Sequence, residues 1–224
     1  MKTYLIQEII NKGLRINSYI VKVTRVSRGR FREERNLVLN LFLDNCVAEL
    51  LHMKIFFGRP PYYKPWIEVF NINPLIILGE EKIGYFDSTI EDALLDYLSA
   101  VIEPGDRLFI EYYRDHETLA ALERGVPITA TRLGYKLLKR GFTWFKDWYF
   151  PEGFMEGNPK LQAEKPISRR HRLIQLKEIC IELINFIKNT ASSKEPIIRK
   201  AYSRAKETLE SLTRELECQI SIAT

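Results

Sequence analysis

The chain has 224 residues, of which 46% are hydrophobic and 12% aromatic, and this composition excludes a disordered protein and indicates one folded domain with a smaller appendage. No apolar run reaches the length of a membrane span and the N-terminal sequence lacks a signal-peptide pattern, so we expect a cytoplasmic protein without a membrane partner. The net charge of +5 lies in residues 160–224, which hold 13 Lys and Arg against 8 Asp and Glu, so attraction to an acidic partner is expected there. The three cysteines and three histidines are scattered, and no metal site is predicted.

The first half of the chain predicts a short helix followed by antiparallel strands. Apolar residues from Leu5 to Ile10 recur at helical spacing, and Gly13 ends this helix. Strands are expected at residues 17–26, 37–43, 47–57, 66–72, 74–78 and 83–86, with Asp44-Asn45 as a tight hairpin turn. The link from Arg25 to Arg35 carries five arginines against two glutamates, and it is either a phosphate or nucleic-acid contact or a solvated loop.

Residues 88–150 predict a helix, a strand, a second helix and a second strand. The first helix spans Ser88 to Val101, the first strand spans Arg107 to Tyr113, the second helix ends at Gly141, and an aromatic strand spans Phe142 to Phe150. A helical crossover places the strand at Arg107 parallel to a neighbour. Together the two halves predict an α+β fold, with a mixed, mostly antiparallel sheet flanked by helices.

The C-terminal part predicts a linker and a helical hairpin, which divides the chain into residues 1–157 and 158–224. Residues 151–166 are rich in Gly and Pro and indicate a linker. Two heptad seams follow, formed by Leu173, Leu176, Cys180, Leu183 and Ile187 and then by Ile198, Tyr202, Ala205, Leu209, Leu212 and Leu216. Pairing about a turn near residue 191 places Cys180 opposite residue 202, which argues against a disulfide with Cys218. The first of these helices is also apolar outside its seam, so it packs on the body or on another copy, and a homo-oligomer through this hairpin is expected.

This order of elements resembles the GNAT N-acetyltransferase superfamily over residues 17–153, with the helix end Leu137-Leu138-Lys139-Arg140-Gly141-Phe142 as its most specific piece. Within the superfamily, the chain is similar to uncharacterised archaeal proteins known as a domain of unknown function. The resemblance implies acyl-CoA as the cofactor, held between two splayed parallel strands, with its pyrophosphate at the N-terminus of the helix that begins at Ser88. It places Gly84, Ser88 and Thr89 at the cofactor.

The loop before this helix departs from the family pattern, which is Gln/Arg-x-x-Gly-x-Gly/Ala, because residues 79–87 read GEEKIGYFD. Ser88 and Glu91 also have the spacing of a capping box, in which the helix end is satisfied by its own side chains. Several acidic residues lie close by in the sequence and would repel a pyrophosphate. We therefore expect acyl-CoA binding to be weak or absent.

The resemblance further implies a carboxylate that acts as general base on the central strands and a tyrosine that protonates the leaving thiolate. Glu68 and Glu111 lie in otherwise apolar strands, and each is either such a base or a solvent-facing side chain. Leu137 occupies the family's tyrosine position, and Tyr112 is a candidate donor in its place.

Three functions stay open from the sequence. The first is an acyl-CoA-dependent N-acyltransferase of unknown substrate. The second is a non-catalytic GNAT-shaped binding or assembly module that oligomerises through its helical hairpin. The third is a nucleic-acid-associated protein that uses the basic tail, including the cluster Ser168-Arg169-Arg170-His171-Arg172.

Overall fold

The structure is a computed structural model that describes residues 1–223, apart from 17–18, 29–35, 44–48, 57–64, 73–74, 79–82, 87, 114, 149–158 and 192–194. It confirms the α+β class. The chain forms two compact units, of which the first comprises Met1–Arg114 with Asp147–Glu164 and the second Asp115–Lys146 with Lys165–Thr224. The arginine-rich link, the turn at Asp44-Asn45 and Cys46 fall wholly or mainly outside the described residues.

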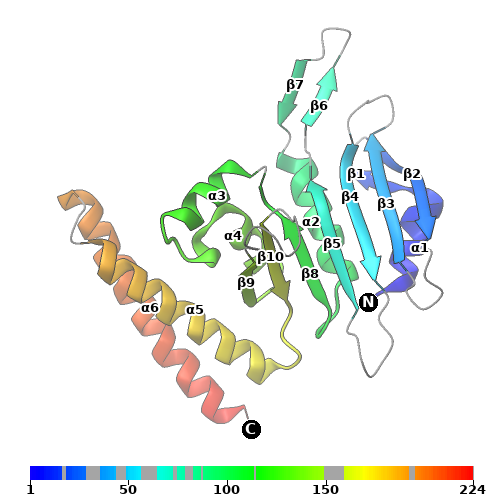
Figure 1. Cartoon of the computed structure of the whole chain (residues 1–224). Helices are drawn as coiled ribbons and strands as arrows, with labels where there is room; N and C mark the ends of the chain where they lie inside the picture. Colours follow the sequence, from blue (N-terminus) through cyan, green and yellow to red (C-terminus); the bar gives the residue numbers. More distant parts are fainter. Residues whose placement is uncertain are drawn as a thin grey trace, which may run out of the picture. The chain divides into compact units, whose positions relative to one another are not determined.

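A mixed sheet is the main feature of the first unit (Figure 1). Its strands are β1 (Leu14–Ile16), β2 (Tyr19–Arg28), β3 (Asn36–Leu43), β4 (Glu49–Phe56), β5 (Trp66–Ile72), β8 (Arg107–Glu111), β9 (Trp144–Trp148) and β10 (Lys160–Glu164). They lie in the order β1-β2-β3-β4-β5-β8-β10-β9. From β1 to β10 the neighbours are antiparallel except for β5 and β8, which are parallel. The predicted mixed, mostly antiparallel sheet is therefore confirmed. The strands β6 (Leu75–Leu78) and β7 (Ile83–Phe86) form a separate antiparallel pair.

One face of the central strands forms the apolar core of this unit. Cross-strand partners share a face of a sheet, and the register pairs Ile67 with Leu108 and Val69 with Ile110. The fully buried residues of this face are Met53, Ile55, Ile67, Val69, Leu108, Ile110, Leu161 and Ala163. The helices α1 (Thr3–Lys12) and α2 (Ser88–Val101) lie behind the sheet in the view of Figure 1, and each buries its apolar stripe. Burial of this face favours the observed register, because a slip by one residue would turn its apolar residues to the other face.

The strand β10 lies where the sequence predicted a linker, and that prediction was wrong. The segment Lys160–Glu164 reads KLQAE and has only two apolar residues, so its hydrophobic signal is weak. Its stability as a strand comes from its position beside β8, where Leu161, Gln162 and Ala163 are all buried. The strand β8 ends at Glu111, so Tyr112 and Tyr113 follow the strand and do not belong to it.

The second unit holds the short helices α3 (His116–Glu123), η1 (Ile128–Ala130) and α4 (Arg132–Leu138) and the long helices α5 (Arg169–Ala191) and α6 (Pro196–Ile222). The Asp115 side chain accepts a hydrogen bond from the Thr118 amide at 3.1 Å and thereby caps α3. The same carboxylate receives the Arg132 guanidinium at 2.7 Å. This ion pair joins the start of α3 to the start of α4.

The helices α5 and α6 form the predicted hairpin, around a core of Leu173, Cys180 and Leu216. The predicted register, with Cys180 opposite residue 202, was wrong. The Cys180 thiol instead lies within hydrogen-bonding reach of the Thr213 side chain, and Lys177 Nζ lies 2.8 Å from Glu217 Oε1. Residues 195–201 are all exposed, so the first turns of α6 lengthen the connection instead of pairing with α5. Cys180 and Cys218 are free thiols.

Candidate polar site on the central strands

The two predicted glutamates lie on the face of the central sheet opposite the apolar core. Glu68 of β5 is the register partner of Phe109 in β8, and Glu111 lies two residues after Phe109. Residues two apart in a strand point to the same face, so Glu68 and Glu111 share this face. In β10, Lys160 is the register partner of Glu111, so its side chain lies on the same face as the two glutamates.

The Lys160 ammonium bridges the two carboxylates. Its Nζ forms a short ion pair with Glu68 Oε1 and lies 3.5 Å from Glu111 Oε1. The side chains are 18% exposed at Glu68, 16% at Lys160 and 6% at Glu111, so the three charges are largely removed from water. Two carboxylates and one ammonium leave the cluster with one net negative charge, whose field is stronger here than in bulk water.

Sequence analysis found the two glutamates and missed Lys160. The signal that would have indicated it is the alternation in KLQAE, where Lys160, Gln162 and Glu164 are polar and the residues between them are apolar. Gln162 Nε2 donates to Glu164 Oε1 at 2.7 Å, and Glu164 lies 3.2 Å from Arg107 Nε. The polar face therefore continues along β10 and β8 beyond the Glu68–Lys160–Glu111 cluster.

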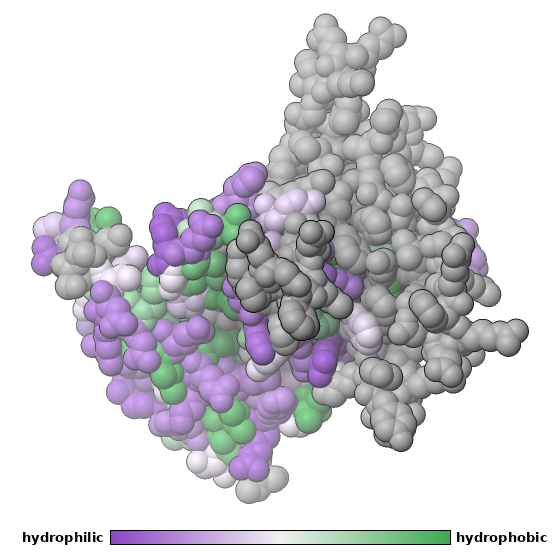
Figure 2. Space-filling model, viewed as in Figure 1, coloured by the Kyte–Doolittle hydropathy of each residue, from purple (hydrophilic) through white to green (hydrophobic). Residues whose placement is uncertain are grey.

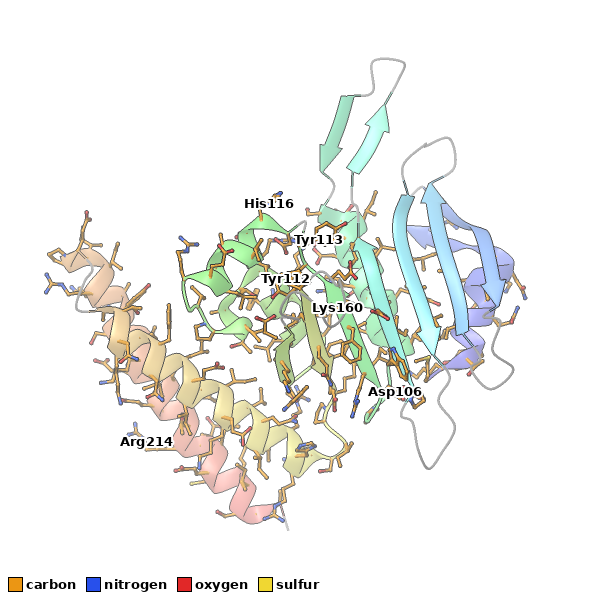
Figure 3. All side chains as sticks on the ribbon, in the orientation of Figure 1. Asp106, Tyr112, Tyr113, His116, Lys160 and Arg214 are labelled. Atoms are coloured by element: carbon orange, nitrogen blue, oxygen red, sulfur yellow. The ribbon has the colours of Figure 1, made fainter. Side chains whose placement is uncertain are left out.

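Tyr112 lies directly after Glu111 and is buried. Its backbone N–H donates to the Pro159 carbonyl at 3.1 Å, and its hydroxyl donates to Asp147 Oδ1 in β9. Tyr112 and Lys160 are labelled in Figure 3. Burial raises the pKa of the Tyr112 phenol, and the hydrogen bond to the Asp147 carboxylate raises the pKa further. The phenol therefore keeps its proton at neutral pH.

The parallel pairing of β5 and β8 stops beside this cluster. Val69 and Ile110 form the last pair, although β5 continues to Ile72 and stays paired with β4 through Leu51. Within the described residues, the end of β5 therefore has no ladder on its β8 side. Glu111, the last residue of β8, and Tyr112, which follows the strand, lie immediately after the point where this pairing ends.

The predicted cofactor residues belong to other elements. Gly84 pairs with Ile77 in the two-stranded sheet, and Ser88 and Thr89 are exposed at the start of α2. The acidic residue of the first turn, Glu91, is buried. The hydrogen bonds of the capping box stay a prediction, because most of the loop before α2 and the residue preceding Ser88 lie outside the described residues.

Two further properties concern the described residues as a whole. No group of three or more His, Cys, Asp and Glu side chains among them is arranged to hold a metal ion. No helix among them combines the length and the apolar character needed to cross a bilayer.

Comparison with known proteins assigns the chain to a family. Residues 17–190 match the model of DUF1122, described as a protein of unknown function, and this match includes β10 and most of α5. A crystal structure of a protein of unknown function from Aquifex aeolicus VF5 is similar, with 35% sequence identity and a TM-score of 0.66 over 92% of this chain and 99% of that chain. None of the curated proteins matches. Because the family model covers well over half of its length, the chain belongs to the DUF1122 family.

Proposed function

We propose that this protein is an acyl-CoA-dependent N-acyltransferase of the GNAT type, with the Glu68–Lys160–Glu111 cluster at the acceptor amine. The observation that carries the proposal is a largely buried pair of carboxylates placed where the parallel pairing of β5 and β8 stops. The order of elements adds support, because antiparallel strands precede α2 and β8 and short helices precede the aromatic strand β9. An archaeal relationship within that superfamily belongs to the same proposal.

The cluster suits the handling of a protonated amine. An amine arrives at neutral pH as an ammonium ion and must lose a proton before its nitrogen can attack. The net negative charge around Lys160 attracts such a cation, and Glu68 or Glu111 accepts its proton. Tyr112 retains its own proton, which its hydroxyl donates to Asp147 in this structure, and it stays the candidate proton donor that the GNAT resemblance implies. Acyl-CoA, when bound, supplies the acyl group as an activated thioester.

The start of α2 offers few groups to hold the nucleotide part of this cofactor. The start of α2 offers backbone N–H groups and the positive end of a helix dipole, which attract anions. Its first turn contributes one acidic residue, Glu91, and no basic one. A pyrophosphate would therefore be held mainly by the backbone, and we expect weak binding of the nucleotide moiety.

The test compares two acyl donors that differ in this moiety. We expect thiol release from acetyl-CoA and from S-acetylpantetheine, in the presence of a panel of primary amines, with kcat/KM values within about tenfold of each other. Glu68→Gln, Glu111→Gln and Tyr112→Phe should each lower the rate by roughly 10²-fold or more, as expected for loss of an acid or base. Glu207→Gln, at an exposed position of α6, is the matched control and should leave the rate of thiol release unchanged.

Two results would count against parts of the proposal. Absence of thiol release from both donors with every amine would overturn the acyltransferase function. Submillimolar affinity for acetyl-CoA in calorimetry, together with a large preference for it over S-acetylpantetheine, would instead contradict the expected weak binding of the nucleotide moiety.

A second function is favoured by the surface of the hairpin. Large apolar side chains are exposed on both of its helices, at Ile181, Ile197, Ile198, Leu212 and Ile222. Figure 2 shows hydrophobic patches among the hydrophilic side chains of α5 and α6. These exposed residues support an assembly module that oligomerises through the hairpin.

The mass of the protein in solution tests this second function. The double substitution Ile197→Asp with Ile222→Asp should convert an oligomer into a monomer in light scattering. Thr208→Asp, at an exposed polar position of α6, is the control and should leave the mass unchanged. An unchanged mass in the double variant would remove the assembly role of these residues.

A further inference from the structure

A pocket in the second unit has its own set of polar groups. It lies between η1, the start of β9 and α5, and its volume is about 300 Å³. Its apolar wall includes Trp144, Phe145 and Ile179, and its polar wall includes Thr129, Glu178 and Glu182. The pocket belongs entirely to one compact unit, and the polar cluster of β5, β8 and β10 belongs to the other.

The amide donor that borders this pocket is already engaged. Thr143 Oγ1 donates to Gln175 Oε1 at 2.5 Å. The Gln175 amide nitrogen lies 3.0 Å from His171 Nε2. Thr143 and Gln175 therefore bond to each other, and the Gln175 amide also contacts a neighbour, so neither side chain is left without a partner.

The groups of the pocket that have no partner among the described residues are one hydroxyl and two carboxylates. Thr129 is only 5% exposed, and its hydroxyl is buried without a partner among the described residues. Such a hydroxyl is destabilising unless a ligand or water completes its hydrogen bond. The side chains of Glu178 and Glu182 lie one helical turn apart on α5 and form no ion pair with a described residue.

The Glu182 carboxyl group at this pocket has a raised pKa. Although the residue as a whole is exposed, desolvation raises the pKa of the Glu182 carboxyl. A cation that binds beside it would compensate this loss of hydration. Carboxylates at this spacing on a helix are close enough to share one ammonium group.

We propose that this pocket is a binding site for a small organic cation, namely a primary ammonium group on a short apolar chain. The ammonium donates N–H hydrogen bonds to the Glu178 and Glu182 carboxylates and to the Thr129 hydroxyl, whose oxygen can accept as well as donate. Trp144 and Phe145 are consecutive in β9 and point to opposite faces of the strand, so one of the two rings would contact the cation, and Ile179 would contact the apolar chain. The site goes beyond the proposed acyl transfer, because it requires neither an acyl donor nor the glutamates of the first unit.

The test is calorimetry on the full chain with hexylammonium chloride at low salt, compared with hexanol and hexanoate. We expect one hexylammonium ion per chain, with hexanol bound at least tenfold more weakly and no measurable hexanoate binding. Glu178→Gln and Glu182→Gln should each weaken hexylammonium binding about five- to tenfold, because each removes one partly exposed charge. Thr129→Val removes the hydroxyl at nearly constant volume and should weaken binding a few-fold.

The control for charge is Glu207→Gln on α6, which should leave hexylammonium binding unchanged. Equal binding of hexanol and hexylammonium would overturn the proposal, as would equal affinity of the Glu178→Gln and Glu182→Gln variants and the unmodified chain. Absence of binding at millimolar hexylammonium would also overturn it. None of these results depends on acyltransferase activity, so the two proposals fail separately.

Discussion

Replacement of Lys160 by Met should destabilise the protein more than loss of any exposed lysine. The substitution keeps an unbranched side chain in β10 and removes the ammonium that lies 3.5 Å from Glu111 and in contact with Glu68. At this distance the attraction to one carboxylate is about 5 kcal/mol for an effective dielectric constant of 20. Part of this attraction offsets the cost of taking the charges out of water. Removing one partner of a buried ion pair typically lowers the free energy of unfolding by about 3–5 kcal/mol. We therefore expect a loss of about 3 kcal/mol in the free energy of unfolding.

Urea denaturation followed by circular dichroism measures this loss, with two further variants as controls. Lys12→Met removes an exposed lysine whose Glu8 contact is 3.4 Å long, and it should cost less than about 0.5 kcal/mol. Adding Glu68→Gln and Glu111→Gln to Lys160→Met removes the two carboxylates that have lost the lysine and should restore most of the stability. The reasoning is refuted if Lys160→Met costs less than about 1 kcal/mol, or if the triple variant is no more stable than Lys160→Met.

Three other predictions concern the second unit. Gly134→Ala should cost at least about 3 kcal/mol in urea denaturation, because a Cβ at this position would lie 1.9 Å from a carbonyl oxygen of η1. Burial opposes the charge of Asp115, but hydrogen bonds from Arg132 and Thr118 outweigh it and lower the pKa of Asp115. Asp115→Asn should therefore cost about 1–2 kcal/mol at pH 7, and this difference should shrink as the pH falls from about 4, the ordinary pKa of the unfolded chain's carboxyl, through the lower pKa of Asp115 in the folded protein. In the native protein Cys218 is exposed and should react with iodoacetamide much faster than Cys180, whose burial raises its pKa; equal labelling rates by mass spectrometry would contradict this.

Local patterns in the sequence predicted the elements whose apolar residues recur with a clear period. The bounds of α2 and β5 agree with the prediction because caps, glycines and prolines mark their ends. The parallel neighbour of β8 followed from the helix that precedes it, because a helical crossover returns the chain in the same direction. These features depend on residues close together in the chain.

The features that sequence analysis missed depend on residues far apart in the chain. β10 is a strand because it pairs with β8, from which it is separated by α3, η1, α4 and β9. The hairpin register depends on how many residues of α6 extend beyond α5, which heptad spacing leaves open. For the same reason the sequence indicated Glu68 and Glu111 one by one but did not predict that Lys160 joins them.

The triple variant of Lys160, Glu68 and Glu111 also separates a structural from a chemical role of the cluster. A buried ionic group often contributes little net stability relative to neutral side chains of similar size, because desolvation offsets the attraction between its charges. If the variant unfolds at the same urea concentration as the unmodified chain, the cluster adds nothing to the stability of the fold. Loss of thiol release in that folded variant would then be a loss of chemistry, and it would assign the charges to the handling of the amine. A folded variant that retains full thiol release would leave the carboxylates without a catalytic part and would favour assembly through the hairpin.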